Sequence, residues 1–195
     1  MAGKTRPRTA SRVAAVQALF QAEQVQISSE TVIDEFMRHR LGTVPGSGGF
    51  EDGRAPSADA ALFARIVRTV TAQQDVLDTM IIAALPEEWP MVRLDPVLRA
   101  ILRAGASELS MSDGPPVKVV INEYMDVGHG FFEGDEPRMV NAILDRVAHL
   151  LRPLEFPDKQ MEGQGSAVAA QARVEGPGGE SPPPQKAEGL LKPIH

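Results

Sequence analysis

Two neighbouring stretches decide the fold of this chain: Val117-Lys-Val-Val-Ile-Asn-Glu-Tyr-Met-Asp-Val127 and Arg138-Met-Val-Asn-Ala-Ile-Leu-Asp-Arg146, with Phe131-Phe132 between them. Their apolar residues have the spacing that predicts helices. Polar side chains interrupt these apolar patterns at four positions: Asn122, Glu123, Asn141 and Asp145. A buried amide or carboxylate is unfavourable unless it is hydrogen-bonded. We therefore expect these residues to tie helices together or to hold a specific surface.

The remaining pattern is also helical, without a convincing alternating strand, and it predicts an all-α protein. Helices are expected to begin at Thr9 or Ser11, Ser29, Ser57 or Asp59, Asp95-Pro96, Pro115-Pro116 and Asp135-Glu136-Pro137. Their ends are expected near Gln24, Leu41, Leu85, Asp113, Gly128 and Pro153. Side-chain oxygens suit the starts of helices because they accept hydrogen bonds from unpaired N–H groups. We also expect a bend near Gln73-Gln74.

Composition divides the chain further. Residues 1–8 are expected to form a flexible basic arm, and residues 9–155 an all-helical domain. Within that domain, glycines and prolines between Gly42 and Pro56 predict a surface loop insertion at about 42–56. Residues 156–195 are rich in glycine and proline, so they cannot bury enough surface to offset their ordering entropy. We expect a disordered tail there.

The charge is unevenly distributed. A net charge of -6 argues against nucleic-acid binding over the whole surface. Yet no acidic residue precedes Glu23, whereas four basic ones do: Lys4, Arg6, Arg8 and Arg12. A basic arm on an acidic protein focuses binding of phosphates onto one place. A solvated run of charges explains the same composition equally well, and an acid-free N terminus is also typical of a mitochondrial transit peptide.

Several classes of site are disfavoured by the sequence. The chain has no cysteine, which excludes disulfides, thiolate zinc sites and a cysteine nucleophile. His129 and Glu133, with Glu123 or Asp126, have a spacing that suggests a metal site, but glycines break the helix that would align them. The longest apolar stretch, Met80 to Leu85, is too short for a membrane span. We expect a soluble, cytoplasmic protein without cofactors that is not an enzyme.

Three segments resemble the transcription antitermination factor NusB family: Arg12-Val-Ala-Ala-Val-Gln-Ala-Leu-Phe20, the stretch from Arg99-Ala-Ile-Leu-Arg103 to Leu109, and Lys118 to Asp145. The resemblance covers about Arg8 to Leu154 in order. It implies two packed three-helix subdomains without catalytic activity. It further implies an RNA-binding partner of NusE, a small-subunit ribosomal protein. The pair would bind boxA-type sequences of nascent ribosomal RNA and, with other Nus factors, help RNA polymerase read through terminators.

The same resemblance implies site residues. An RNA surface would comprise the basic arm with Lys4 and further residues: Arg6, Arg8, Arg12, Gln17, Lys118, Asp135 and Met139. Phe20 and Leu98 would face NusE. Met139 stands where phenylalanine is common, which would replace a base stack with softer thioether packing. Leu98 stands just before Arg99, where many members carry an acidic residue.

Two other functions remain open at this stage. One is a purely protein-binding helical scaffold in which the basic arm is idle. The other is the accessory module of an RNA methyltransferase, although the chain has neither a glycine-rich cofactor-binding domain nor a catalytic cysteine. The sequence also leaves open whether the free protein is a monomer or a homodimer that covers its RNA face.

Overall fold

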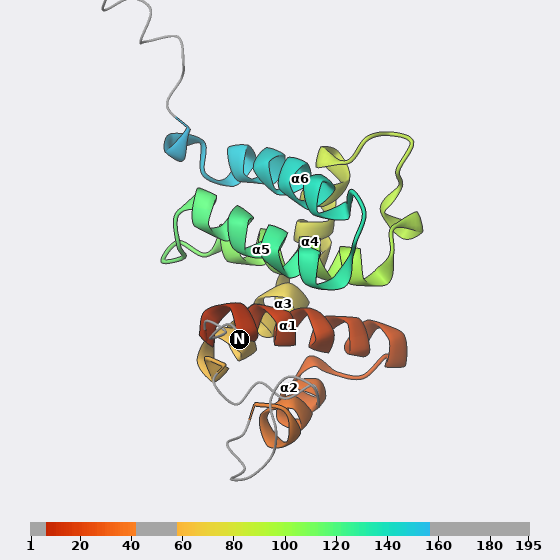
Figure 1. Cartoon of the computed structure of the whole chain (residues 1–195), viewed down its shortest axis with the longest axis vertical. Coiled ribbons are helices and arrows are strands. Elements are labelled where there is room, and N and C mark those ends of the chain that lie inside the picture. Colours follow the sequence, from red (N-terminus) through yellow and green to blue (C-terminus); the bar gives the residue numbers. More distant parts are fainter. Residues whose placement is uncertain (1–6, 42–57, 157–195) are drawn as a thin grey trace, which may run out of the picture. The chain divides into compact units, whose positions relative to one another are not determined.

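The computed structural model describes residues 7–41 and 58–156, and this part of the chain is all-helical, as predicted (Figure 1). Its six α-helices are α1 (Pro7–Val25), α2 (Ser29–His39), α3 (Ala60–Ala84), α4 (Pro96–Ser110), α5 (Val117–Phe131) and α6 (Glu136–Leu151). Two short 3-10 helices, η2 (Met91–Arg93) and η3 (Pro153–Glu155), precede α4 and follow α6. The predictions for Lys4, Arg6, the 42–56 loop and the tail fall on residues outside these ranges, apart from Phe156.

The helices form two groups of three. In the first, α1 packs on α2 and α3, and in the second α4, α5 and α6 all pack on one another (Figure 1). Contacts of α4 with α1 and α3 join the groups, and α1 also touches α5. This arrangement agrees with the two packed three-helix subdomains that the resemblance implied.

Capping residues set most helix starts. The side chains of Ser28, Asp59 and Asp95 cap α2, α3 and α4, respectively. Each accepts a hydrogen bond from a backbone N–H in the first turn of its helix. Asp95 is followed by proline at the first helical position, as predicted. The prediction for α1 was wrong: the helix already begins at Pro7, and the Ser11 hydroxyl donates to the carbonyls of Pro7 and Asp59, at 2.9 and 2.8 Å, instead of capping.

Two helices depart from regular expectations. The predicted bend in α3 is confirmed, since Gln73 has non-helical dihedrals (φ -123°, ψ 18°). Helix α5, in contrast, runs three residues past its predicted end at Gly128. Packing explains the extension. Gly128 is buried, and the side of it from which a side chain would project faces Pro137 at the start of α6. Tertiary contacts outweigh the roughly 1 kcal/mol that each glycine costs in a helix.

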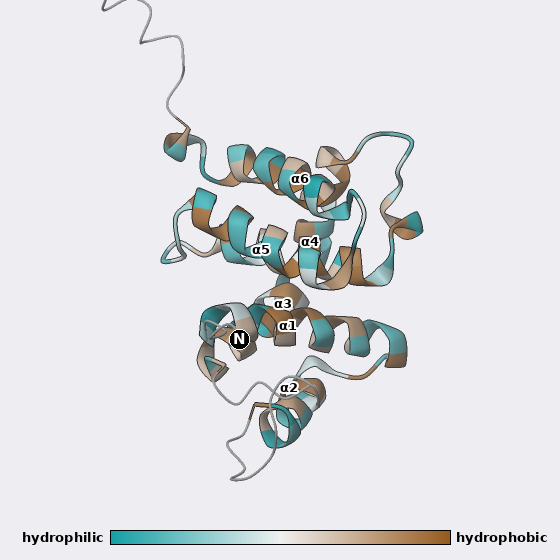
Figure 2. Ribbon diagram, viewed as in Figure 1, coloured by the Kyte–Doolittle hydropathy of each residue, from teal (hydrophilic) through white to brown (hydrophobic). Residues whose placement is uncertain are grey.

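The core lies between amphipathic helices, each of which carries both apolar and polar residues (Figure 2). In the first group, the Phe36 and Phe63 rings stack at a centroid distance of 5.6 Å and join α2 to α3. In the second, Gly105 of α4 lets Leu144 of α6 approach so closely that a Cβ at this position would lie 2.6 Å from its Cδ1. Within the ranges described, no helix is long and apolar enough to cross a membrane.

Candidate nucleic-acid interface

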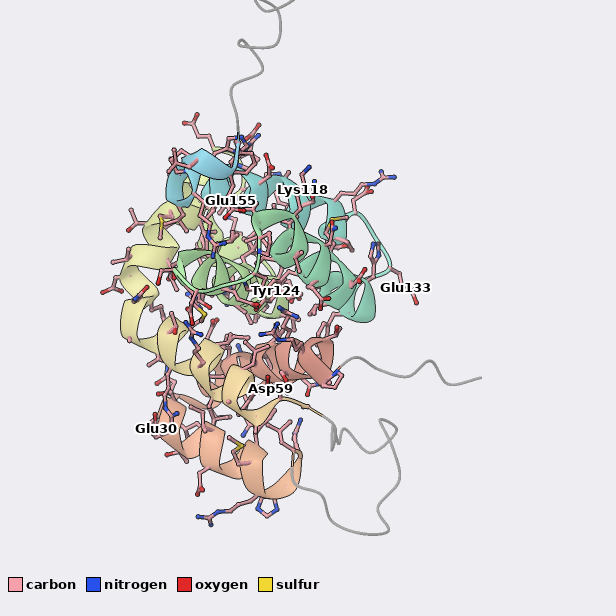
Figure 3. All side chains as sticks on the ribbon, turned by 90° about the vertical axis from the view of Figure 1, so that its left-hand side faces the viewer. Glu30, Asp59, Lys118, Tyr124, Glu133 and Glu155 are labelled. Carbon is pink, nitrogen blue, oxygen red and sulfur yellow. The ribbon has the colours of Figure 1, made fainter. Side chains whose placement is uncertain are left out.

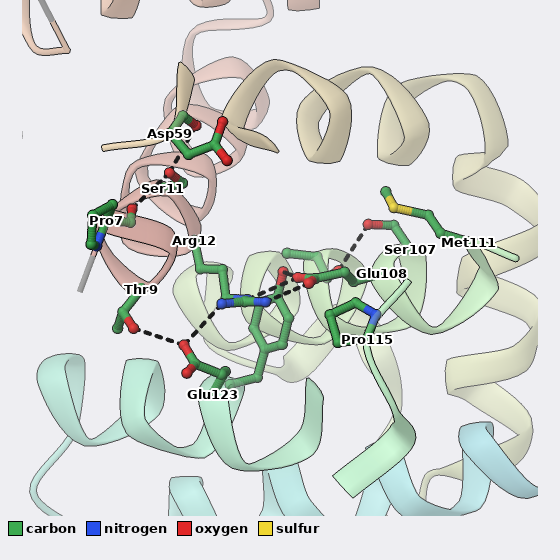
Figure 4. Close-up of polar contacts among 12 residues, drawn as sticks. Pro7, Thr9, Ser11, Arg12, Asp59, Ser107, Glu108, Met111, Pro115 and Glu123 are labelled. Carbon is green, nitrogen blue, oxygen red and sulfur yellow. Dashed lines mark hydrogen bonds and ion pairs between the residues drawn. The ribbon is translucent and has the colours of Figure 1, made fainter. Parts of the chain in front are cut away.

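A buried ion-pair network holds the start of α1 against α4 and α5 (Figure 4). The Arg12 guanidinium donates to both carboxylate oxygens of Glu108, from Nε at 2.9 Å and from Nη2 at 2.5 Å. Its Nη1 donates to Oε2 of Glu123 at 2.9 Å. The Tyr124 hydroxyl adds a bond to Glu108 at 3.0 Å, and the Thr9 hydroxyl one to Glu123 at 2.7 Å. Three helices thus meet at one guanidinium.

Burial and charge fix the protonation states of Arg12 and Tyr124 in this network. Burial by itself lowers the pKa of Arg12, but the hydrogen bonds and charge of Glu108 outweigh it, so the pKa is raised and Arg12 stays cationic. Burial, together with the Glu108 charge, raises the pKa of Tyr124 well above its ordinary value, so its hydroxyl stays protonated as a donor. The network is therefore a permanent link between the two helix groups.

Two exposed cations, Arg8 and Lys118, lie on the helices that the Arg12 network joins. Arg8 is exposed in the first turn of α1, next to the Thr9 that binds Glu123 of α5. Lys118 is exposed in the first turn of α5. Figure 3 places Lys118 near one end of α5 and Glu133 in the turn beyond the other end. Helix α5 therefore runs from η3, where the Val117 N–H donates to Glu155, past the start of α1 at Glu123 and on towards the start of α6.

The start of α6 carries the remaining predicted contacts. Asp135 is exposed and makes no side-chain capping bond, contrary to the capping role expected of it. Its carboxylate instead forms a solvent-exposed ion pair with the Arg138 guanidinium at 3.2 Å. Met139 is half-buried and packs against the core. The carboxylate of Asp135 and one side of the Met139 thioether are thus accessible on the same helix turn.

A separate groove of about 400 Å³ lies where α1, α2, α4 and α5 meet. Its lining is mostly apolar, with one arginine: Val16, Gln17, Phe20, Gln21, Gln24, Val25, Arg40, Val97 and Phe131. The groove brings Gln17 and Phe20 together, although the resemblance implied RNA for the first and a protein for the second. Val97, Phe131 and Arg40 come from three distant segments, so no local pattern in the sequence could join them to this site.

Known proteins resemble this chain in sequence and in fold. The NusB family model matches residues 9–149, which is most of the chain. The chain belongs to the NusB family. Two relatives named transcription antitermination protein NusB are 65% identical over 160 residues (Granulibacter bethesdensis; 82% of this chain, 98% of that protein) and 53% identical over 143 residues (Gluconobacter oxydans; 73% and 87%).

Solved structures agree on the fold. NusB of T. maritima superposes with a TM-score of 0.60 and 25% identity, covering 78% of this chain and 98% of that one. A chain in a crystal structure of a plectonemic RNA supercoil gives a TM-score of 0.59 at 20% identity, covering 75% and 96%, which supports the fold alone. The NusB family consists of RNA-binding transcription antitermination proteins and not of enzymes.

Two of the predicted site residues lie in the interior. Arg12 is 2% exposed, and each of its three guanidinium nitrogens donates to a carboxylate, which leaves it unsuited to a phosphate contact. Leu98 is 3% exposed, so its side chain supports the surface from below and does not face a partner. The resemblance, together with the basic run before it, implies an RNA contact for Arg12, yet its spacing from Val16 and Leu19 (i+4, i+7) places it on the buried stripe.

Of the four polar residues that interrupt the apolar patterns of α5 and α6, one lies at a helix contact within the described part of the chain and the others do not. Glu123 ties helices together, as expected. Asn122 and Asn141 are exposed instead, and Asp145 makes its polar contact with His149, one turn along its own helix. As for the metal site considered above, no group of three or more His, Cys, Asp or Glu in the described ranges could hold a metal ion.

Proposed function

We propose that this protein is an RNA-binding transcription antitermination factor that acts together with NusE, the small-subunit ribosomal protein. The pair would bind boxA-type sequences of nascent ribosomal RNA and help RNA polymerase read through terminators, in a complex with other Nus factors. The observation that carries the proposal is the 65% identity to a NusB antitermination protein along 98% of that protein. Such a role belongs in the cytoplasm, where bacterial transcripts are made.

The exposed cations supply the phosphate contacts in this proposal. Arg8 and Lys118 are both accessible, at the start of α1 and the start of α5. Lys4 and Arg6 precede Arg8 in the sequence and extend the same run of positive charge. Contacts of this kind release counterions, so binding would be sensitive to salt and tolerant of sequence. Arg12 supports this surface indirectly, because its network holds α1 against α5.

The start of α6 supplies contacts to bases. Asp135 offers an exposed carboxylate that can accept a hydrogen bond from an exocyclic amine. The Met139 thioether can pack against the face of a base, in the manner of a soft apolar surface. Splayed single-stranded bases are read in this way, by stacking and by hydrogen bonds to their edges.

The groove around Phe20 is the proposed site for NusE. Its apolar lining and its single arginine suit a protein segment better than a phosphate backbone. Gln17 lies in the same groove, so we assign it to the edge between the two partners. Leu98 follows Val97 in the sequence but is buried, so it would act only through packing. This groove is also the observation that favours a pure protein-binding scaffold as the second candidate function.

An RNA titration separates the two candidates. Labelled boxA-type RNA is titrated with the full chain, with and without NusE, at two salt concentrations. In the Arg8→Gln variant we expect weaker binding and a salt slope flatter by about 0.7, the value for one phosphate contact with a single strand. Arg93→Gln removes an exposed cation at η2 and should leave both unchanged. Equal affinity and slope in all three proteins would favour the scaffold.

A further inference from the structure

A second groove of about 430 Å³ lies along the outer side of α5. Among the residues that the structure describes, its lining comes from this one helix: Val119, Asn122, Glu123, Met125, Asp126 and His129. Four of them (119, 122, 126 and 129) are spaced as one stripe of a helix. None was assigned to RNA or to a partner by the sequence.

The polar atoms of this groove are available to a ligand. Within residues 7–41 and 58–156, the side chains of Asn122, Asp126 and His129 have neither a hydrogen bond nor an ion pair. Glu123 differs, because Thr9 and Arg12 both donate to its Oε2 and hold the carboxylate in place. Its Oε1 accepts no bond from the same part of the chain. The groove therefore combines a rigid acceptor with three accessible polar groups.

The charges of the groove favour a particular chemistry. Glu123 and Asp126 repel phosphate, but they accept hydrogen bonds from N–H groups. The cations lie beside the groove and not within it: Lys118 immediately precedes Val119, and Arg8 immediately precedes the Thr9 that binds Glu123. A single strand whose phosphates meet Lys118 and Arg8 would thus turn a base edge towards the carboxylates. Val119 and Met125 offer apolar surface for the face of that base.

We propose that this groove recognises a single-stranded nucleotide with an exocyclic amine at C6 of a purine or C4 of a pyrimidine, that is adenine or cytosine, through the carboxylate of Asp126. This inference rests on the proposed RNA-binding function. A carboxylate accepts a hydrogen bond from the amine of these bases, but it meets a carbonyl oxygen at the corresponding position of uracil (O4) and of guanine (O6), which it repels. The groove would therefore discriminate against uridine at one position of the bound RNA.

Atomic substitutions in the RNA test this directly. The probe is a labelled boxA-type RNA in which each adenosine is replaced in turn by purine riboside, and each cytidine by pyrimidin-2-one riboside. Either replacement removes only the exocyclic amine. With the unaltered full chain, we expect about a tenfold loss of affinity at one of these positions. In Asp126→Ala that loss should disappear, while the salt slope stays unchanged.

Matched controls separate this contact from general electrostatics. Glu88→Ala removes the same charge from the exposed turn between α3 and α4 and should keep the tenfold loss. If Asp126→Ala instead binds every RNA more tightly by the same factor, and the loss persists, Asp126 only repels phosphate and the groove proposal is overturned. If the unaltered chain shows no salt-sensitive RNA binding at all, the proposed function fails and the groove with it.

Discussion

A single guanidinium in the interior connects residues that are far apart in the sequence. Arg12 binds Glu108, 96 residues away, and Glu123, 111 residues away. The apolar spacing around Arg12 could place it on a buried face, but no local pattern identifies a partner at such a separation. This is why sequence alone assigned Arg12 to RNA together with the arginines before it. Arg8, only four residues earlier, is exposed.

Removal of Arg12 should destabilise the fold strongly. Arg12→Ala leaves Glu108, which is 1% exposed, as an uncompensated buried charge, so we expect a loss of about 3–5 kcal/mol in the free energy of unfolding. Urea denaturation followed by circular dichroism measures it. Arg65→Ala breaks an ion pair with Asp113 whose side chains are 46% and 66% exposed, and should lose less than about 1 kcal/mol. Equal losses in the two variants would contradict the structural role of Arg12.

The carboxylate of Glu23 should make the stability of the protein depend on pH. Partial burial raises the pKa of Glu23, but Arg99 and Arg103 outweigh this effect and hold the pKa below its ordinary value of 4.5. A lowered pKa in the folded state stabilises the protein above the unfolded-state pKa, and this contribution is lost as the pH falls through the folded-state pKa. Glu23→Gln should therefore be less stable than the unaltered chain at pH 7.

The difference should shrink as the pH is lowered to 3. Urea unfolding at pH 7, 5 and 3 measures it, with Glu87→Gln as a control for the loss of an exposed carboxylate. A difference that is the same at all three pH values would mean that Glu23 acts through packing and not through its charge.

At the scale of elements, helix starts could be predicted better than helix ends. Asp95 followed by Pro96 is a local signal, and the structure places the start of α4 there. The end of α5 could not be predicted, because its Gly128 is buried against Pro137 of the next helix. Similarly, Asp135 has the right residue type and position for a cap, yet its carboxylate pairs with Arg138 instead.

Two glycines in neighbouring helices should respond in opposite ways to the same change. Gly105→Ala would place a Cβ 2.6 Å from Cδ1 of the buried Leu144, so we expect a loss of about 1–3 kcal/mol through overpacking of α4 on α6. Gly130→Ala meets nothing within 4 Å in α5 and should gain up to about 1 kcal/mol through helix propensity. Thermal unfolding of both variants tests this, and a gain in Gly105→Ala would contradict the close α4–α6 packing.

At the scale of the whole molecule, the sequence predicted the helical class and the two groups of helices, the latter through family resemblance. The grooves could not be predicted in this way. The Phe20 groove needs four helices to meet, and the groove on α5 depends on which side of that helix the core leaves uncovered. Charge and resemblance both place Arg8 and Arg12 in one group, whereas in the fold Arg8 is exposed and Arg12 is buried.

The most direct test of the account is to map the RNA contact by NMR. Backbone amide shifts of the full chain are recorded while unlabelled boxA-type RNA is added. We predict that the largest changes gather at the start of α1, on the outer side of α5 and at the start of α6, including Arg8, Lys118, Asp126 and Asp135. Changes confined to α2 and the second half of α3, with these residues unaffected, would contradict it.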